Sequence, residues 1–208
     1  MPDLSLRNYF AEGEEILRFL RESGEHPAML LHSCCAPCSS HVISALREFF
    51  ALTVYYYNPN IAPEEEYRKR KAEQIRFLRE VGIPYLEAPY EGEKFVAAVR
   101  GLENEPERGA RCPVCFALRL EKTARIAKEN GFPYFCTTLT VSPHKDARIL
   151  NEIGEKTGKE VGIRFFPSDF KKKDGYLHSI RLSEEYKLYR QDYCGCVFSR
   201  KNPGEKEK

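Results

Sequence analysis

Short apolar runs alternate with longer amphipathic segments along most of the chain. The runs AMLLHS, ALTVYYYN and YFCTTLT have the length and the aromatic and β-branched content of buried strands, and PYLEAP and IRFFPSD resemble them. The segments between them carry apolar residues at helical spacing, as at Ile75, Leu78 and Val81. Strands that alternate with helices predict a parallel sheet with helices on both faces.

The expected fold is therefore a three-layer α/β domain of the Rossmann-like kind, close to the PP-loop and HUP architecture. A chain of 208 residues can bury the core of one such domain. We expect a single domain over residues 1–198 and a disordered tail over residues 199–208, where the sequence is SRKNPGEKEK. Helices are expected near residues 8–24, 39–50, 64–82, 93–102, 112–131, 144–158 and 177–190.

Composition bears on where the protein is located in the cell and on what its cysteines do. The formal net charge is only +2, so nucleic-acid binding would have to come from local clusters of basic residues. The first residues lack the features of a signal peptide, and no apolar run approaches the roughly 20 residues that span a bilayer. We expect a cytoplasmic protein with no membrane partner. In a reducing compartment, eight cysteines in clusters indicate metal binding or redox chemistry.

Two cysteine pairs lie where this architecture builds sites. The motif SCCAPC follows the first strand directly, and ligands of α/β sheets bind beyond the carboxyl ends of strands. The motif RCPVC opens a helix, because Pro113 suits a first helical turn, and free N–H groups there favour thiolates. The two pairs could supply four thiolates to zinc or to an iron–sulfur cluster. These four residues are Cys34, Cys35, Cys112 and Cys115.

A third pair, Cys194 and Cys196, lies one residue apart in YCGC, after the last expected helix. A disulfide across so short a gap is strained and easily reduced, which is typical of catalytic disulfides. We expect this segment to be flexible and to approach the site without forming its scaffold. A redox dithiol favours iron–sulfur over zinc, although two further metal ligands remain the alternative. Cys38 has no place in this scheme, and Cys136 is expected to be a core residue.

The chain resembles the QueH-type epoxyqueuosine reductases through CCAPC, YYNPNIAPEEEYRKR, GARCPVCFALRL, TTLTVSPHK, FKKKDGYLHS and YRQDYCGC. The resemblance implies an oxidoreductase that reduces the epoxide of epoxyqueuosine in transfer RNA to give queuosine, without cobalamin and with a 4Fe–4S cluster. It implies that the two pairs above ligate the cluster and that Cys194 and Cys196 are the catalytic redox pair. The unassigned Cys38 leaves room for a second iron ion, and the electron donor is not identified.

Basic residues beside the presumed site are the candidates for contacts with RNA. Arg108 and Arg111 lie just before the second cysteine pair. The segments YRKRK and FKKKDGY mix basic residues, which can hold phosphates, with aromatic residues, which can stack on bases. Protons could come from several nearby titratable groups. The candidates are His144, Asp146, Asp169 and Tyr193.

Two other functions remain open from the sequence. A PP-loop-like enzyme of transfer RNA thiolation would need a glycine- and serine-rich phosphate loop after the first strand, where this chain has SCCAPCSS. A zinc-stabilised RNA-binding module would use the same cysteines without a redox step.

Overall fold

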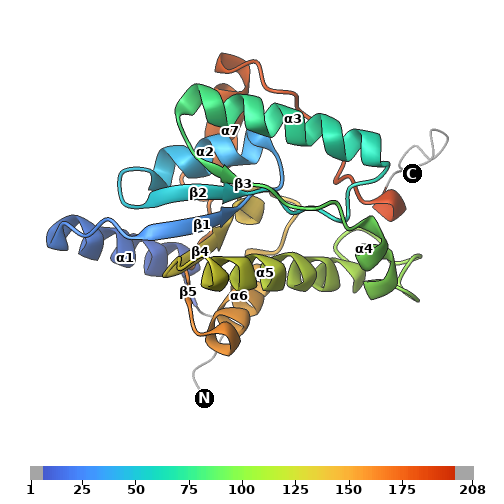
Figure 1. The fold of residues 1–208 in the computed structure, drawn as a ribbon, viewed down its shortest axis with the longest axis horizontal. Helices are drawn as coiled ribbons and strands as arrows, with labels where there is room; N and C mark the ends of the chain where they lie inside the picture. The colour runs from blue at the N-terminus through green and yellow to red at the C-terminus, as the bar shows by residue number, and fades with distance from the viewer. Residues whose placement is uncertain (1–6, 200–208) are drawn as a thin grey trace.

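The computed structural model describes residues 7–199, and within them five strands form one parallel sheet (Figure 1). The strand order is β3-β2-β1-β4-β5, and every neighbouring pair is parallel. The strands are β1 (Ala28–His32), β2 (Ala51–Tyr55), β3 (Tyr85–Leu86), β4 (Tyr134–Thr137) and β5 (Arg164–Phe165). The predicted α/β fold is confirmed. In the expected tail, residues 200–208 lie outside the described part, and the single-domain assignment stays a prediction.

Seven α-helices connect and cover the strands in the described range. They are α1 (Tyr9–Ser23), α2 (Ala36–Leu46), α3 (Glu64–Val81), α4 (Gly92–Ala98), α5 (Arg111–Glu129), α6 (Ala147–Val161) and α7 (Gly175–Glu185). Two short 3₁₀ turns, η2 (Thr138–Val141) and η3 (Val197–Ser199), complete the set. Among these helices none is both long and apolar enough to cross a bilayer.

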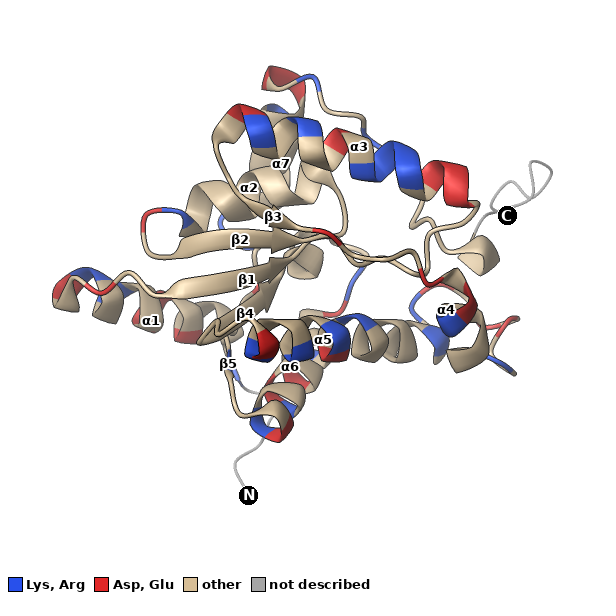
Figure 2. Cartoon of the chain, in the orientation of Figure 1, with Lys and Arg blue, Asp and Glu red and all other residues tan. Residues whose placement is uncertain are grey.

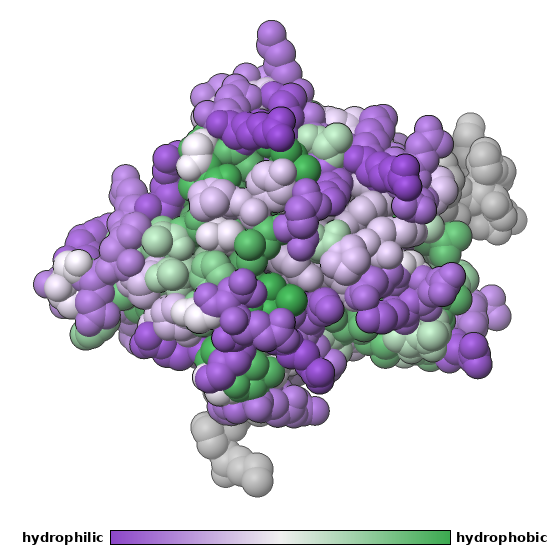
Figure 3. All heavy atoms as spheres, in the orientation of Figure 1, coloured by the Kyte–Doolittle hydropathy of each residue, from purple (hydrophilic) through white to green (hydrophobic). Residues whose placement is uncertain are grey.

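The sheet separates two apolar cores. Successive side chains of a strand point to opposite faces, so Met29 and Leu31 of β1 enter one core and Leu30 enters the other. Helices α1, α2, α3 and α7 cover the first face, and α5 and α6 cover the second. Charged residues of both signs lie along the helices, while the strands of the sheet are almost free of them (Figure 2). One face of the molecule shows mostly polar side chains with apolar areas between them (Figure 3).

Three helix boundaries differ from the sequence expectation near the site. Helix α2 begins at Ala36 rather than residue 39, because Pro37 suits a first turn and Cys35 is the extended N-cap. Cys38 therefore lies on the helix and not in a loop. Helix α6 begins at Ala147, since the carboxylate of Asp146 caps its first turn. Helix α7 runs from residue 175 to 185, which leaves residues 186–196 as a connection without helix.

Candidate metal and redox site

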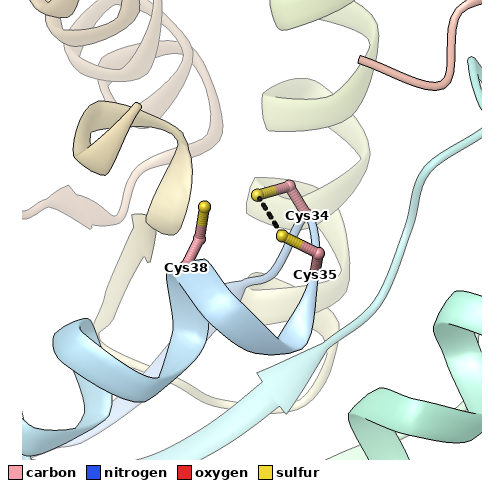
Figure 4. A group of neighbouring side chains, drawn as sticks. All are labelled: Cys34, Cys35 and Cys38. Atoms are coloured by element: carbon pink, nitrogen blue, oxygen red, sulfur yellow. Dashed lines mark hydrogen bonds between the residues drawn. The ribbon is translucent and has the colours of Figure 1, made fainter. Parts of the chain in front are cut away.

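Three cysteines meet where β1 passes into α2 (Figure 4). The Sγ atoms of Cys34, Cys35 and Cys38 all lie within 4.8 Å of one another, and those of Cys34 and Cys35 are 3.7 Å apart. Within residues 7–199 this is the only group of three or more potential metal-binding side chains so close together. We call these residues the cysteine trio. The sequence analysis had left Cys38 unassigned because the four-cysteine ligand scheme had no place for it.

Backbone hydrogen bonds hold the connection that carries the trio. The N–H of Ser33 donates to the carbonyl of Tyr55 at 3.0 Å, which extends the sheet pairing by one residue. The N–H of Cys34 donates to Thr138 Oγ1 at 3.1 Å, and Asn58 Nδ2 donates to the carbonyl of Ser33 at 2.8 Å. The trio is therefore anchored on three sides by the carboxyl ends of β1, β2 and β4.

Within the trio, the pKa of Cys34 is lowered while those of Cys35 and Cys38 are raised. The pKa of Cys34 is held well below its usual range because the thiols of Cys35 and Cys38 hydrogen-bond to it, with further help from Arg119 and Thr138. The same hydrogen bonds raise the pKa of Cys35 to about 12 and that of Cys38 well above its usual range. Metal binding by all three sulfur atoms would therefore release protons.

A buried arginine lies beneath the cysteines. Arg119 is 2% exposed, and its guanidinium contacts Asn58 Oδ1, His32 Nε2 at 3.3 Å and Cys115 Sγ at 4.0 Å. No carboxylate within residues 7–199 forms an ion pair with it. Burial and this guanidinium lower the pKa of His32 to about 3, so the imidazole is neutral. A buried cation without a carboxylate partner requires another anion, and thiolates or an anionic metal–sulfur group meet that need.

The second pair, Cys112 and Cys115, lies in the first turn of α5. Burial raises the pKa of Cys115 to about 11, and the N–H of Arg108 donates to Cys112 Sγ at 3.3 Å. The pair is not part of the compact trio. Arg119 connects the two groups, since its guanidinium contacts Cys115 and also lowers the pKa of Cys34. The assignment of a four-cysteine ligand set stays a prediction.

The third pair is docked against the loop after β2. The N–H of Ala62 donates to the carbonyl of Gly195 at 2.9 Å, and an antiparallel bridge joins Cys196 to Ile61. Gly195 has a φ of 93°, a left-handed conformation that favours glycine. Cys194 and Cys196 are both free thiols, and Cys196 is buried. The loop after β2 offers the backbone groups that pair with this segment, and its flexibility during turnover stays a prediction.

Two cations contact this segment at Cys194. Arg70 Nη1 donates to the carbonyl of Cys194 at 3.4 Å. Lys145 Nζ lies 3.6 Å from Cys194 Sγ and 3.8 Å from a carboxylate oxygen of Glu107. Burial opposes the charge of Lys145, but Cys194 and Glu107 outweigh it and raise the pKa of the ammonium group. Lys145 therefore remains charged beside the sulfur atom of Cys194.

A cavity of about 480 Å³ separates the trio from the docked segment. Its wall includes the trio, residues 142–145 and residues 190–194, together with Asn58, Asn60 and Ile61. Of the candidate proton donors, His144 and Tyr193 line this cavity. Asp146 caps α6, and Asp169 is paired with Lys171 at 2.6 Å, so both carboxylates have structural partners.

The two arginines expected to bind substrate differ in their surroundings. Arg108 is exposed, and its guanidinium donates to the carbonyls of Pro143 and His144. Arg111 is 1% exposed, and its Nη1 donates to backbone carbonyls of the segment 102–105. Arg111 therefore fixes the loop that precedes α5. Substrate binding by either residue stays a prediction, and the exposed Arg108 is the better placed.

Comparison with known proteins gives one consistent result. Residues 29–202 match the family described as epoxyqueuosine reductase QueH. The chain is 42% identical over 203 residues to a protein of that name from Streptococcus pyogenes serotype M1, covering 95% of this chain and 80% of the other. It is 40% identical over 205 residues to one from Staphylococcus epidermidis, covering 95% and 86%. A third, from Thermotoga maritima, is 37% identical over 176 residues, covering 82% and 89%.

Proposed function

The chain belongs to the QueH family of epoxyqueuosine reductases, and from this premise we propose that it reduces the epoxide of epoxyqueuosine in transfer RNA to give queuosine. The observation that carries the proposal is the cysteine trio above the buried Arg119, at the carboxyl ends of the strands and beside a cavity. The family match does not favour a thiolation enzyme or a zinc-stabilised RNA-binding module. An enzyme that acts on transfer RNA is expected to work in the cytoplasm.

The thiols of Cys194 and Cys196 can supply the electrons and protons that the reduction consumes. Converting an epoxide to an alkene breaks two C–O bonds and releases water, which takes two electrons and two protons. Oxidation of the thiols of Cys194 and Cys196 to a disulfide supplies both. An external reductant then has to restore the dithiol, and thiol exchange or an electron carrier are the chemical classes that can do so. No cobalamin is needed for this balance.

We assign the metal to the cysteines around Arg119. Cys34, Cys35, Cys112 and Cys115 would hold a 4Fe–4S cluster, and Cys38 would bind either the cluster or a second iron ion. Ligands of a cluster bind different iron atoms, so they need not be as close together as the trio is. When bound, the cluster supplies single-electron transfer and a Lewis acid for the epoxide oxygen. The buried Arg119 stabilises the negative charge of the thiolates.

The substrate has to reach this site as an extruded base. The cysteines are largely buried, so the modified nucleotide must leave the anticodon stack to enter the cavity. Arg108 is exposed and donates to the carbonyls of Pro143 and His144 in the cavity wall, where it would contact phosphates beside the entering nucleotide. His144 and Tyr193 line the same cavity and are the candidates for delivering protons.

An assay on anaerobically purified protein tests the proposal. Iron and acid-labile sulfide should be present together, and an anticodon stem-loop bearing epoxyqueuosine should lose the mass of one oxygen atom when a reductant is supplied. The control replaces Cys34 with serine under identical conditions. Protein that contains zinc but no sulfide and leaves the RNA mass unchanged would contradict the function.

A further inference from the structure

A second cavity, of about 560 Å³, adjoins the cavity beside the trio. The two share a wall, since Pro143, His144 and Lys145 line both. The rest of the second wall comes from the start of α5, from residues 146–149 at the start of α6, and from Arg108, Asp169 and Lys171. We call it the basic cavity. A chain that fills the first cavity can therefore continue directly into the second.

The charged side chains of the basic cavity favour an anion. Its cationic residues are Arg108, Lys145, Arg148 and Lys171. Its two carboxylates are those of Asp146 and Asp169. Both carboxylates are already engaged, because Asp146 accepts from the first backbone N–H groups of α6 and Asp169 is paired with Lys171 at 2.6 Å. The cations therefore outnumber the carboxylates, and a negatively charged ligand is attracted to this wall.

Three of these cations are accessible to a ligand. Arg108 is exposed, and within residues 7–199 no carboxylate forms an ion pair with it. The side chain of Arg148 is 53% exposed and is paired with Glu152 on the same helix, and that of Lys171 is 27% exposed. Exposed ion pairs contribute little to stability, so Arg148 remains available to a further anion.

The opposite ends of the same two helices carry the opposite charge. A cavity there, also lined by α5 and α6, has three glutamates in its wall and a single basic residue, Arg125. The glutamates are Glu121, Glu129 and Glu160. A polyanion is therefore attracted to the end of the helix pair that carries Cys112 and repelled from the other end.

We propose that the basic cavity binds the phosphate groups next to epoxyqueuosine in the anticodon loop, through Arg108, Arg148 and Lys171. This inference rests on the proposed function. Consecutive nucleotides are joined through one phosphate, so when one nucleotide enters the first cavity its neighbour must occupy an adjoining site. A phosphodiester is anionic and only accepts hydrogen bonds, which matches three cationic donors. The volume suits a group the size of one nucleotide, whereas a docked protein would need a face of roughly 800 Å².

Binding of three anticodon stem-loops tests the subsite. The first is unmodified, the second has neutral methylphosphonates on both sides of the wobble nucleotide, and the third has them in the stem. Arg148→Ala with Lys171→Ala should bind the first RNA about 10-fold more weakly than wild type, with a salt slope lower by about 2. The same loss should remain for the third RNA. For the second RNA it should nearly vanish, because the contacted charges are already absent and the two effects do not add.

Two controls accompany the double variant. Arg125 is exposed on α5 at the acidic end of the helix pair, so Arg125→Ala should change neither the affinity nor the salt slope. Arg148→Lys with Lys171→Arg keeps both charges and should retain most of the affinity.

Three outcomes would overturn the subsite. They are unchanged affinity and salt slope in the double alanine variant, an equal loss for all three RNAs, or unchanged RNA binding with slower reduction. The last would show that the basic cavity receives an electron carrier instead. If the wild-type protein reduces epoxyqueuosine while the double variant binds all three RNAs normally, only the subsite fails. If the wild-type protein leaves epoxyqueuosine unreduced in the activity assay, the proposed function fails.

Discussion

The two walls of the cavity hold their cysteines in different ways. The trio is brought together by local sequence, since Cys34, Cys35 and Cys38 fall within one strand-to-helix connection, and hydrogen bonds with Thr138 and Asn58 then hold that connection in place. Cys194 and Cys196 are placed by long-range contacts alone, through the loop after β2 and the cations of α3 and the loop before α6.

The difference separates two chemical tasks. A metal ligand has to keep its position during turnover, and a connection between core elements provides that rigidity. A thiol pair that forms and breaks a bond, and that meets an external reductant, has to change its geometry. A segment docked by a few hydrogen bonds can open at a low free-energy cost. We therefore expect the trio to be needed for metal content and the docked pair to be needed for turnover.

The largest effect should come from the rigid wall. Cys34→Ser removes the sulfur atom whose pKa is lowered most, so both iron content and activity should be lost. Cys136→Ala is the matched control, because Cys136 is fully buried in β4 but lies outside the trio. Iron determination and the reduction assay measure both outcomes. Full iron and a normal spectrum in Cys34→Ser would remove this residue from the ligand set.

Variants of the docked wall should lose activity without losing iron. Cys194→Ser with Cys196→Ser should fold, keep its iron and visible absorbance, and fail in repeated turnover with a chemical reductant. Mass spectrometry of oxidised wild-type protein should show a peptide that spans both residues and is lighter by two hydrogen atoms. Loss of iron in the double variant would break the comparison and make these residues metal ligands.

A smaller effect is expected from Arg119, whose guanidinium contacts Cys115 and lowers the pKa of Cys34. Arg119→Met should weaken iron binding by roughly 10-fold, because the thiolates lose their buried counter-charge. The apo protein should lose little stability, since a buried unpaired charge is itself costly. Iron affinity can be measured by competition with a chelator, and Arg119→Lys should recover part of it. Unchanged affinity in Arg119→Met would show that this cation does not act on the metal.

The smallest effect should come from the exposed Arg108. Arg108→Ala should weaken binding of the anticodon stem-loop by a few-fold and reduce the salt slope by about 1, because one phosphate contact is lost. Arg111→Ala should instead lower the free energy of unfolding by about 1–3 kcal/mol, since buried carbonyls lose their donor. Salt titrations and denaturant unfolding distinguish the two. The reverse pattern would show that the buried arginine is the one that reaches RNA.

The sequence predicted the scaffold better than the cavity. Alternating apolar periodicity was enough for the parallel sheet, and SCCAPC was placed at the end of its first strand. Pro37 could have shown that α2 starts early and that Cys38 joins the trio. Arg119 follows Cys115 by one helical turn, a signal that was present but unused. The docking of Cys196 against Ile61 depends on residues far apart in the chain, and local patterns carry no information on such pairs.

The segment with Cys194 and Cys196 follows all five strands in the chain, so it is synthesised after the sheet against which the cavity forms. All five strands are complete at Phe165, whereas the cavity closes only when Cys196 has been made. The intervening stretch of roughly 30 residues takes roughly 2–6 s at common rates of translation. Until that segment docks, the cysteine trio lacks one wall of its cavity. Iron delivery can therefore precede closure of the cavity, and the last wall then shields the loaded centre.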